Sequence, residues 1–274
     1  MSPAELPIGI FDSGVGGLTV LKALRARLPR EHLLYLGDTA RLPYGTKGPE
    51  TVSRYAVQAA AHLVERGIKL LVVACNTASA VAMPALTREF APLPVIGVVE
   101  AGAVAAVRHS KTGHIGILAT ESTVRGGAYE RAIRAQRPDA HVFSQACSLF
   151  VALAEEGWTK GPLVGSVVRE YLHPILEEKK RDGMDCLVLG CTHFPLLKGA
   201  IAHVAGAQVK LVDSGETVAE AVAALISDKK IPRTHDARGD ARFLATDGAE
   251  RFARVGSLFL GETIEENNVE IVDL

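Results

Sequence analysis

Two stretches decide the fold, LLVVACNT at residues 70–77 and CLVLGCTH at residues 186–193. Each begins as a short apolar run that is typical of a buried parallel strand, and each then changes to polar residues. Cys75 and Cys191 therefore lie where their strands end. Because ligands collect at the carboxyl ends of strands in open α/β sheets, these matched strand ends predict one site built by two halves of the chain.

A single buried cysteine is more often a small core residue than a reactive one. Here Asn76 and Thr77 follow the first thiol, and Thr192 and His193 follow the second. Polar residues beside a thiol suit a reactive site and do not suit a core. We therefore interpret both thiols as functional.

The chain has 274 residues and a formal net charge of -1, from 30 basic and 31 acidic side chains. This balance leaves no positive surplus to hold a phosphate backbone, so we expect no nucleic-acid partner. The first residues lack the basic and apolar regions of a signal peptide, and no apolar run approaches the roughly 20 residues of a membrane span. We therefore expect a cytoplasmic protein with no membrane partner.

The four cysteines do not have the paired spacing of a zinc site, so we expect no metal. A cytoplasmic setting also argues against structural disulfides. Cys147 lacks a polar triplet beside it, and Cys186 lies within its strand, so we assign both to the core. No lysine stands in a context that suggests a Schiff base, and no cofactor is expected.

Strands and helices alternate along most of the chain, which predicts parallel sheets with helices on both faces. The first strand, 7–11, ends in a glycine-rich turn at 12–17, and a helix over 18–28 follows. This order is that of a phosphate-binding motif, but the glycines match neither a dinucleotide fingerprint nor a P-loop. The alternative is that the turn faces a small polar ligand.

We predict an α/β fold with two pseudo-symmetric lobes, each a mostly parallel sheet flanked by helices, and an active site in the cleft between them. The first lobe is expected to contain residues 1–97 and 208–274, and the second residues 98–207. The strand at 209–212 and the helix at 216–227 are therefore assigned to the first lobe. Aromatic residues near the end of the chain suggest that it closes back on that lobe.

Two thiols on opposite walls of a cleft suit a two-base racemase or epimerase. Inverting a carbon centre requires one group to remove a proton from one face and another to return a proton to the opposite face. Thiols fit because nearby groups can tune their pKa from about 8.5 toward neutrality. His193 and Asp12 are candidates for that tuning, although isolated residues of these kinds more often fill a core or cap a helix.

Four motifs carry a family resemblance: DSGVGG at 12–17, PYG at 43–45, CNTAS at 75–79 and GCTHFPLL at 190–197. In this order and spacing they resemble the glutamate racemases of the aspartate/glutamate racemase family. The resemblance implies a cofactor-independent isomerase that interconverts L- and D-glutamate and supplies D-glutamate for bacterial peptidoglycan. Family members are often dimers, so a homodimer is expected.

The resemblance also implies roles for individual residues. Cys75 and Cys191 are implied to be the two acid/base residues, with Asp12 and His193 supporting the thiols. A larger set is implied to line the substrate site: Asp12, Ser13, Tyr44, Gly45, Asn76, Thr77, Thr120, Thr123, Glu155, Thr192 and His193. Glu155 is preferred over Glu156 as the acid near the substrate.

Three alternatives stay open. The first is a related racemase or isomerase that acts on aspartate, a hydantoin or another small acid. The second is a non-catalytic two-lobe amino-acid-binding protein, which would bind its ligand without exchanging the α-proton. The third is a thiol redox protein, which would form a disulfide between Cys75 and Cys191, although a ligand-sized cleft would hold the sulfurs too far apart.

Overall fold

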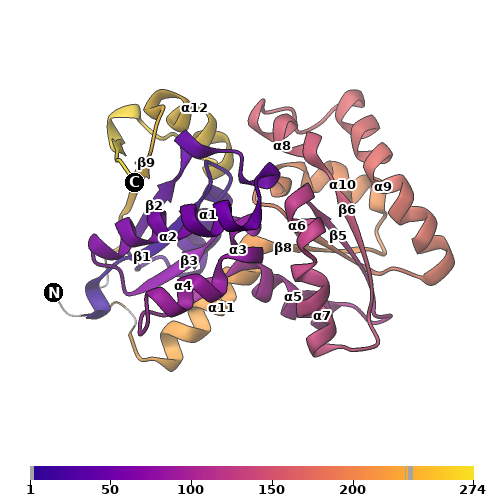
Figure 1. Ribbon diagram of the computed structural model, residues 1–274. Helices are drawn as coiled ribbons and strands as arrows, with labels where there is room; N and C mark the ends of the chain where they lie inside the picture. The colour runs from indigo at the N-terminus through magenta and orange to yellow at the C-terminus, as the bar shows by residue number, and fades with distance from the viewer. Residues whose placement is uncertain (1–2, 232, 234–236) are drawn as a thin grey trace.

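The computed structural model describes residues 3–231, 233 and 237–274, which form two α/β lobes lying side by side (Figure 1). Each lobe contains one sheet, and the strands of both sheets pair in parallel. The predicted α/β fold with two parallel sheets flanked by helices is confirmed.

The first sheet has the strand order β10-β9-β2-β1-β3-β4. Its strands are β1 (Ile8–Asp12), β2 (Leu33–Gly37), β3 (Leu70–Val73), β4 (Val95–Gly97), β9 (Ala241–Ala245) and β10 (Val269–Ile271). β1, β2 and β3 are buried along their whole length, which explains their continuous apolar sequences. Phe11 pairs with Val73, so Asp12 and Cys75 emerge at the same edge of the sheet.

The second sheet has the order β6-β5-β7-β8. Its strands are β5 (His114–Ala119), β6 (His141–Ala146), β7 (Cys186–Gly190) and β8 (Lys210–Asp213). Ala119 pairs with Gly190, so Thr120 and Cys191 follow neighbouring strands at one edge. The second lobe therefore repeats the arrangement that places Asp12 beside Cys75 in the first.

The assignment of the strand near 209–212 to the first lobe is wrong. β8 pairs with β7 in the second sheet, with Leu187 opposite Leu211. The physical reason is that a short connection, made of a 3-10 helix (Phe194–Leu197) and α10 (Lys198–Ala205), joins the two strands, and consecutive parallel strands joined in this way usually become neighbours. The chain returns to the first lobe after Asp213, with α11 (Ser214–Asp228), and not at residue 208.

Helices cover both faces of each sheet. Around the first sheet these are α1 (Leu18–Arg27), α11 and α12 (Ala249–Leu260) on one face, and α2 (Pro49–Glu65), α3 (Asn76–Val81) and α4 (Met83–Glu89) on the other. Around the second they are α5 (Val98–His109), α6 (Glu121–Gly126), α7 (Ala128–Gln136), α8 (Ser148–Glu155), α9 (Pro162–Asp182) and α10. Each helix in the described ranges is too short or too polar to cross a lipid bilayer.

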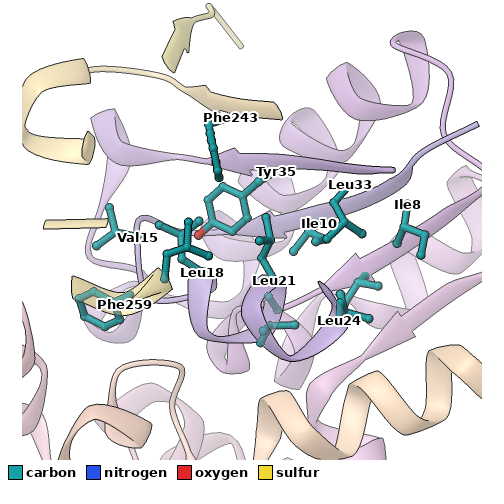
Figure 2. Packing of buried hydrophobic residues seen from close by; sticks show 14 of the residues in the cluster. Ile8, Ile10, Val15, Leu18, Leu21, Leu24, Leu33, Tyr35, Phe243 and Phe259 are labelled. Carbon is teal, nitrogen blue, oxygen red and sulfur yellow. The ribbon is translucent and has the colours of Figure 1, made fainter. Parts of the chain in front are cut away.

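The end of the chain closes on the first lobe, as its aromatic residues suggested. β9 pairs with β2 and carries Phe243, whose ring centroid lies 6.3 Å from that of Phe252 on α12. Figure 2 shows Phe243 beside Tyr35 of β2, with Leu18 of α1 and Phe259 of α12 close by. The returning segment thus builds one face of the first core and brings α12 to the boundary with the second lobe.

Candidate active site

Residues at the carboxyl ends of the two sheets meet between the lobes. Thr77, which follows β3, lies 3.1 Å from Thr120, which follows β5, measured between their hydroxyl oxygens. The Thr19 hydroxyl at the start of α1 donates to the carbonyl oxygen of Thr192, after β7, at 3.0 Å. The two predicted halves of the site are therefore in direct contact.

Asp12 ends β1 and is fully buried at the head of the glycine-rich turn. Its Oδ2 accepts a hydrogen bond from the Gly14 amide at 3.0 Å, whereas its Oδ1 has no hydrogen-bond partner. Burial raises the pKa of Asp12, and the charge of His193 opposes that rise. The turn fits closely against the second lobe, because a Cβ at Gly16 would lie 2.4 Å from the Thr192 hydroxyl oxygen.

Cys75 forms the N-cap of α3 and is 5% exposed. Its Sγ accepts from the Ala78 amide at 3.5 Å and lies 3.5 Å from the Ser13 hydroxyl oxygen. Burial, followed by the charge of Asp12, raises the pKa of the Cys75 thiol to about 12. Cys75 is therefore a protonated thiol at neutral pH.

Cys191 has a different partner. Its Sγ lies 3.8 Å from Nδ1 of His193, and Nε2 of that histidine lies 3.1 Å from Oε1 of Glu155. Burial disfavours the charged imidazole, but Cys191 and Glu155 outweigh it and raise the pKa of His193 to about 10. Glu155, at the end of α8, shows the complementary change, because its hydrogen bond to His193 lowers its pKa. His193 is therefore an imidazolium beside the second thiol.

Three hydroxyl groups form a closed triangle across the boundary between the lobes. Thr77 comes from the first lobe, and Thr120 and Thr123 come from the second. The hydroxyl oxygen of Thr123 lies 3.3 Å from that of Thr77 and 3.1 Å from that of Thr120. Three hydroxyls that can each turn a proton outward are suited to binding a carboxylate.

Asn76 is held by a second polar network. Its Nδ2 donates to the Tyr129 hydroxyl at 2.8 Å and lies 3.3 Å from the Ser214 hydroxyl oxygen. Ser214 in turn donates to the carbonyl oxygen of Leu189 at 2.8 Å. The buried Oδ1 of Asn76 has no hydrogen-bond partner, so the network fixes the amide and leaves an acceptor free.

Tyr44 is fixed by a carboxylate that sequence analysis missed. Asp38 is fully buried and follows β2, and its Oδ2 accepts from the Tyr44 hydroxyl at 2.5 Å and from Nε of Arg41 at 2.7 Å. Its Oδ1 accepts from the Thr246 hydroxyl at 3.0 Å. Gly45 packs against the second lobe, since a Cβ there would lie 3.0 Å from Cβ of Thr120.

The structure brings the strand-end residues singled out from the sequence to the boundary between the lobes, whereas the ring of Tyr44 packs within the first lobe against Phe11 and Tyr55. Of the two candidate acids, Glu155 contacts His193, whereas Glu156 is exposed. Asp38 and Ser214 carried a usable signal, because each follows a strand at the same edge as a predicted site residue. The sequence around Tyr129 carried no such signal.

The fold and the site together define a class of protein. Two free thiols, one from each lobe, have separate polar partners, and a cluster of three threonine hydroxyls lies with them. This arrangement suits an isomerase that moves a proton between the two faces of a carbon centre.

Comparison with known proteins agrees with this class. Residues 18–222 match the family model described as Asp/Glu/hydantoin racemase, and the chain belongs to this family. It is 50% identical over 254 residues to the glutamate racemase of Geobacter metallireducens, with 93% of this chain and 92% of that protein covered. The predicted resemblance to the glutamate racemases is confirmed.

Solved structures give the same result. The crystal structure of glutamate racemase from Francisella tularensis in complex with D-glutamate is 36% identical and has a TM-score of 0.89, covering 98% of both chains. A glutamate racemase from Bacillus anthracis is 34% identical and has a TM-score of 0.92, covering 99% of this chain and 98% of that one. The chain is therefore similar to these enzymes over nearly its whole length.

Proposed function

We propose that this chain is an isomerase that interconverts L- and D-glutamate without a cofactor, with Cys75 and Cys191 as its two acid/base groups. The observation that supports this most strongly is the pairing of each thiol with different partners. Ser13 and Asp12 lie at Cys75, and His193 with Glu155 lies at Cys191. Two unlike environments on opposite lobes suit one proton donor and one proton acceptor.

The proton balance follows from these environments. For one enantiomer, the Cys191 thiolate removes the α-proton, leaving a carbanion delocalised into the α-carboxylate. The Cys75 thiol then gives its proton to the opposite face of the same carbon. The reaction ends with Cys191 as thiol and Cys75 as thiolate, which is the form that accepts the other enantiomer. Burial raises the pKa of Cys75 to about 12, so in the free protein this thiol begins as the donor.

Glutamate carries two carboxylates and an ammonium, and the boundary between the lobes offers groups for each. We assign a carboxylate to the hydroxyl triangle of Thr77, Thr120 and Thr123. We assign the ammonium to the unpartnered acceptors, Oδ1 of Asp12 and Oδ1 of Asn76. These groups bind charge without a surplus of basic residues, which fits the nearly neutral composition.

We place this activity in the cytoplasm, where it supplies D-glutamate for peptidoglycan synthesis. The two thiols are 5% and 6% exposed, so glutamate reaches them only when the lobes separate. The expected homodimer stays a prediction, which light scattering of the purified protein tests.

The test is racemisation of L-glutamate and of D-glutamate, followed by circular dichroism with the purified protein. We expect Cys75→Ser and Cys191→Ser each to lower kcat by about 10²- to 10⁴-fold, the usual contribution of a general acid or base. Cys186→Ala, at the start of β7, is the matched control and should stay close to the wild type. Near-normal turnover in either serine variant would contradict the two-thiol mechanism, and turnover of aspartate in place of glutamate would change the substrate.

A further inference from the structure

The C-terminal helix α12 belongs to the first lobe, yet two of its side chains contact the second. Nη2 of Arg251 donates to Oε2 of Glu155 at 2.6 Å. The Phe259 ring meets the His193 ring edge to face, with centroids 5.0 Å apart and planes at 77°. Figure 1 places α12 and α8 at the same end of the molecule, where the lobes meet.

The two carboxylate oxygens of Glu155 contact two different cations. Its Oε2 is taken by Arg251, while its Oε1 lies 3.1 Å from Nε2 of His193. Both interactions lower the pKa of Glu155, the one with His193 more strongly. With each oxygen occupied from a different side, the carboxylate has little freedom to rotate, and the imidazole that it holds is fixed in turn.

We propose that Arg251 is a positioning residue: from the opposite lobe it fixes Glu155, which orients His193 against the Cys191 sulfur. This inference rests on the proposed racemase function and extends it to one half of the reaction. The contacts run from Arg251 through Glu155 and His193 to Cys191, and no step requires Arg251 to touch the substrate.

The arrangement depends on closure of the lobes. Because the thiols are buried, glutamate can enter only after the lobes separate, and separation breaks both the Arg251–Glu155 ion pair and the Phe259–His193 contact. His193 is then held by fewer groups until the lobes close again. The reactive alignment at Cys191 therefore forms only together with the closed state, so this thiol is not activated while the site is open to water.

The effect is confined to one thiol. The titratable groups that face His193 are Cys191, Glu155 and, at longer range, Asp12, with Arg251 acting through Glu155. Cys75 is instead surrounded by Ser13, the Ala78 amide and Asp12, none of which lies on α12. Loss of Arg251 should consequently slow proton transfer at Cys191 and leave transfer at Cys75 unchanged.

The experiment compares Arg251→Met with the wild type, using glutamate deuterated at Cα as each enantiomer in turn. L- and D-glutamate have equal free energies, so kcat/KM must fall equally in both directions, by up to about fivefold for a half-exposed ion pair. The α-deuterium isotope effect distinguishes the two thiols. The isotope effect on kcat/KM should rise for the enantiomer from which Cys191 removes the proton, because that removal now limits the rate more strongly. It should fall toward unity for the other enantiomer, because removal of its proton by Cys75 then limits the rate less.

Three controls complete the design. Arg254→Met removes an exposed arginine from the same helix and should leave both kinetic quantities near the wild type. Arg251→Lys retains a cation and should recover part of the lost kcat/KM. The wild type measured in the same assay shows whether the protein racemises glutamate at all, so failure of the proposed function is seen separately. Unchanged kcat/KM in Arg251→Met, or isotope effects that move in the same direction for both enantiomers, would overturn the inference.

Discussion

Replacing Gly16 by alanine is a sharp test of how closely the two lobes must fit. Gly16 lies in the turn after β1, and its backbone faces the strand end that carries Cys191. An added Cβ would lie 2.4 Å from the Thr192 hydroxyl oxygen and 2.5 Å from Nδ1 of His193. Both distances are about 1 Å short of ordinary contact, and both atoms belong to buried side chains.

The cost can be worked from this overlap. Overpacking a filled interior typically costs about 1–3 kcal/mol, so the unfolding free energy should fall by that amount. The larger effect should be on catalysis, because Nδ1 is the atom that faces the Cys191 sulfur at 3.8 Å. A displacement of about 1 Å at a reacting group lowers the rate by about 10²-fold. We therefore expect kcat/KM of Gly16→Ala to fall about a hundredfold while the protein stays folded.

The assay is racemisation of glutamate followed by circular dichroism, with urea unfolding of each variant. Gly14→Ala is the matched control, since a Cβ there would meet only Leu42 Cδ2 at 3.5 Å, an ordinary contact. Its kcat/KM should stay within about threefold of the wild type. If Gly16→Ala is as active as Gly14→Ala, the close fit of the turn against His193 does not matter and the reasoning is refuted.

Two further predictions concern charge and buried hydrogen bonds. The pKa of His193 is about 10 in the folded chain and about 6.5 when unfolded, so the stability that its imidazolium contributes is complete below about pH 6.5 and is lost as pH rises through 10. Urea unfolding at about pH 6 and pH 9 should show this decline in the wild type and a smaller one in His193→Gln; equal declines would contradict it. Tyr44→Phe removes a donor from the buried Asp38 carboxylate and should lower the unfolding free energy by about 1–3 kcal/mol. A loss well below that range would contradict this prediction, because it would show that hydrogen bonds from Arg41 and Thr246 are enough to satisfy the carboxylate.

The strand ends and their thiols could be predicted because the signal is local. An apolar run followed by Cys-Asn-Thr or Cys-Thr-His reports both a buried strand and a change to polar surroundings within eight residues. The same local logic placed Asp12 at the end of β1, and the carboxyl-edge rule then brought these residues together. The repeated plan of two lobes followed from the alternation of strands and helices.

Pairing between distant segments could not be predicted in this way. The sheet to which β8 belongs follows from its short connection to β7, and nothing within the four residues of the strand itself reports that. Arg251 contacts Glu155 across 96 positions of sequence, and Tyr129 contacts Asn76 across 53. Which of Glu155 and Glu156 faces His193 likewise depends on where α8 ends and on the direction of each side chain there. Glu155 is the last residue of the helix, and Glu156 is its C-cap residue.

The most direct test of the two-thiol account is the position of deuterium early in the reaction in D₂O. L-glutamate and D-glutamate are incubated separately with the purified protein, and substrate and product enantiomers are separated and analysed at Cα. A two-base mechanism returns a solvent-derived deuteron only to the opposite face, so the account predicts deuterium in the product enantiomer and almost none in the recovered substrate. Deuterium that appears equally in both enantiomers from the outset would indicate a single base, and no exchange from a folded sample would contradict the isomerase function.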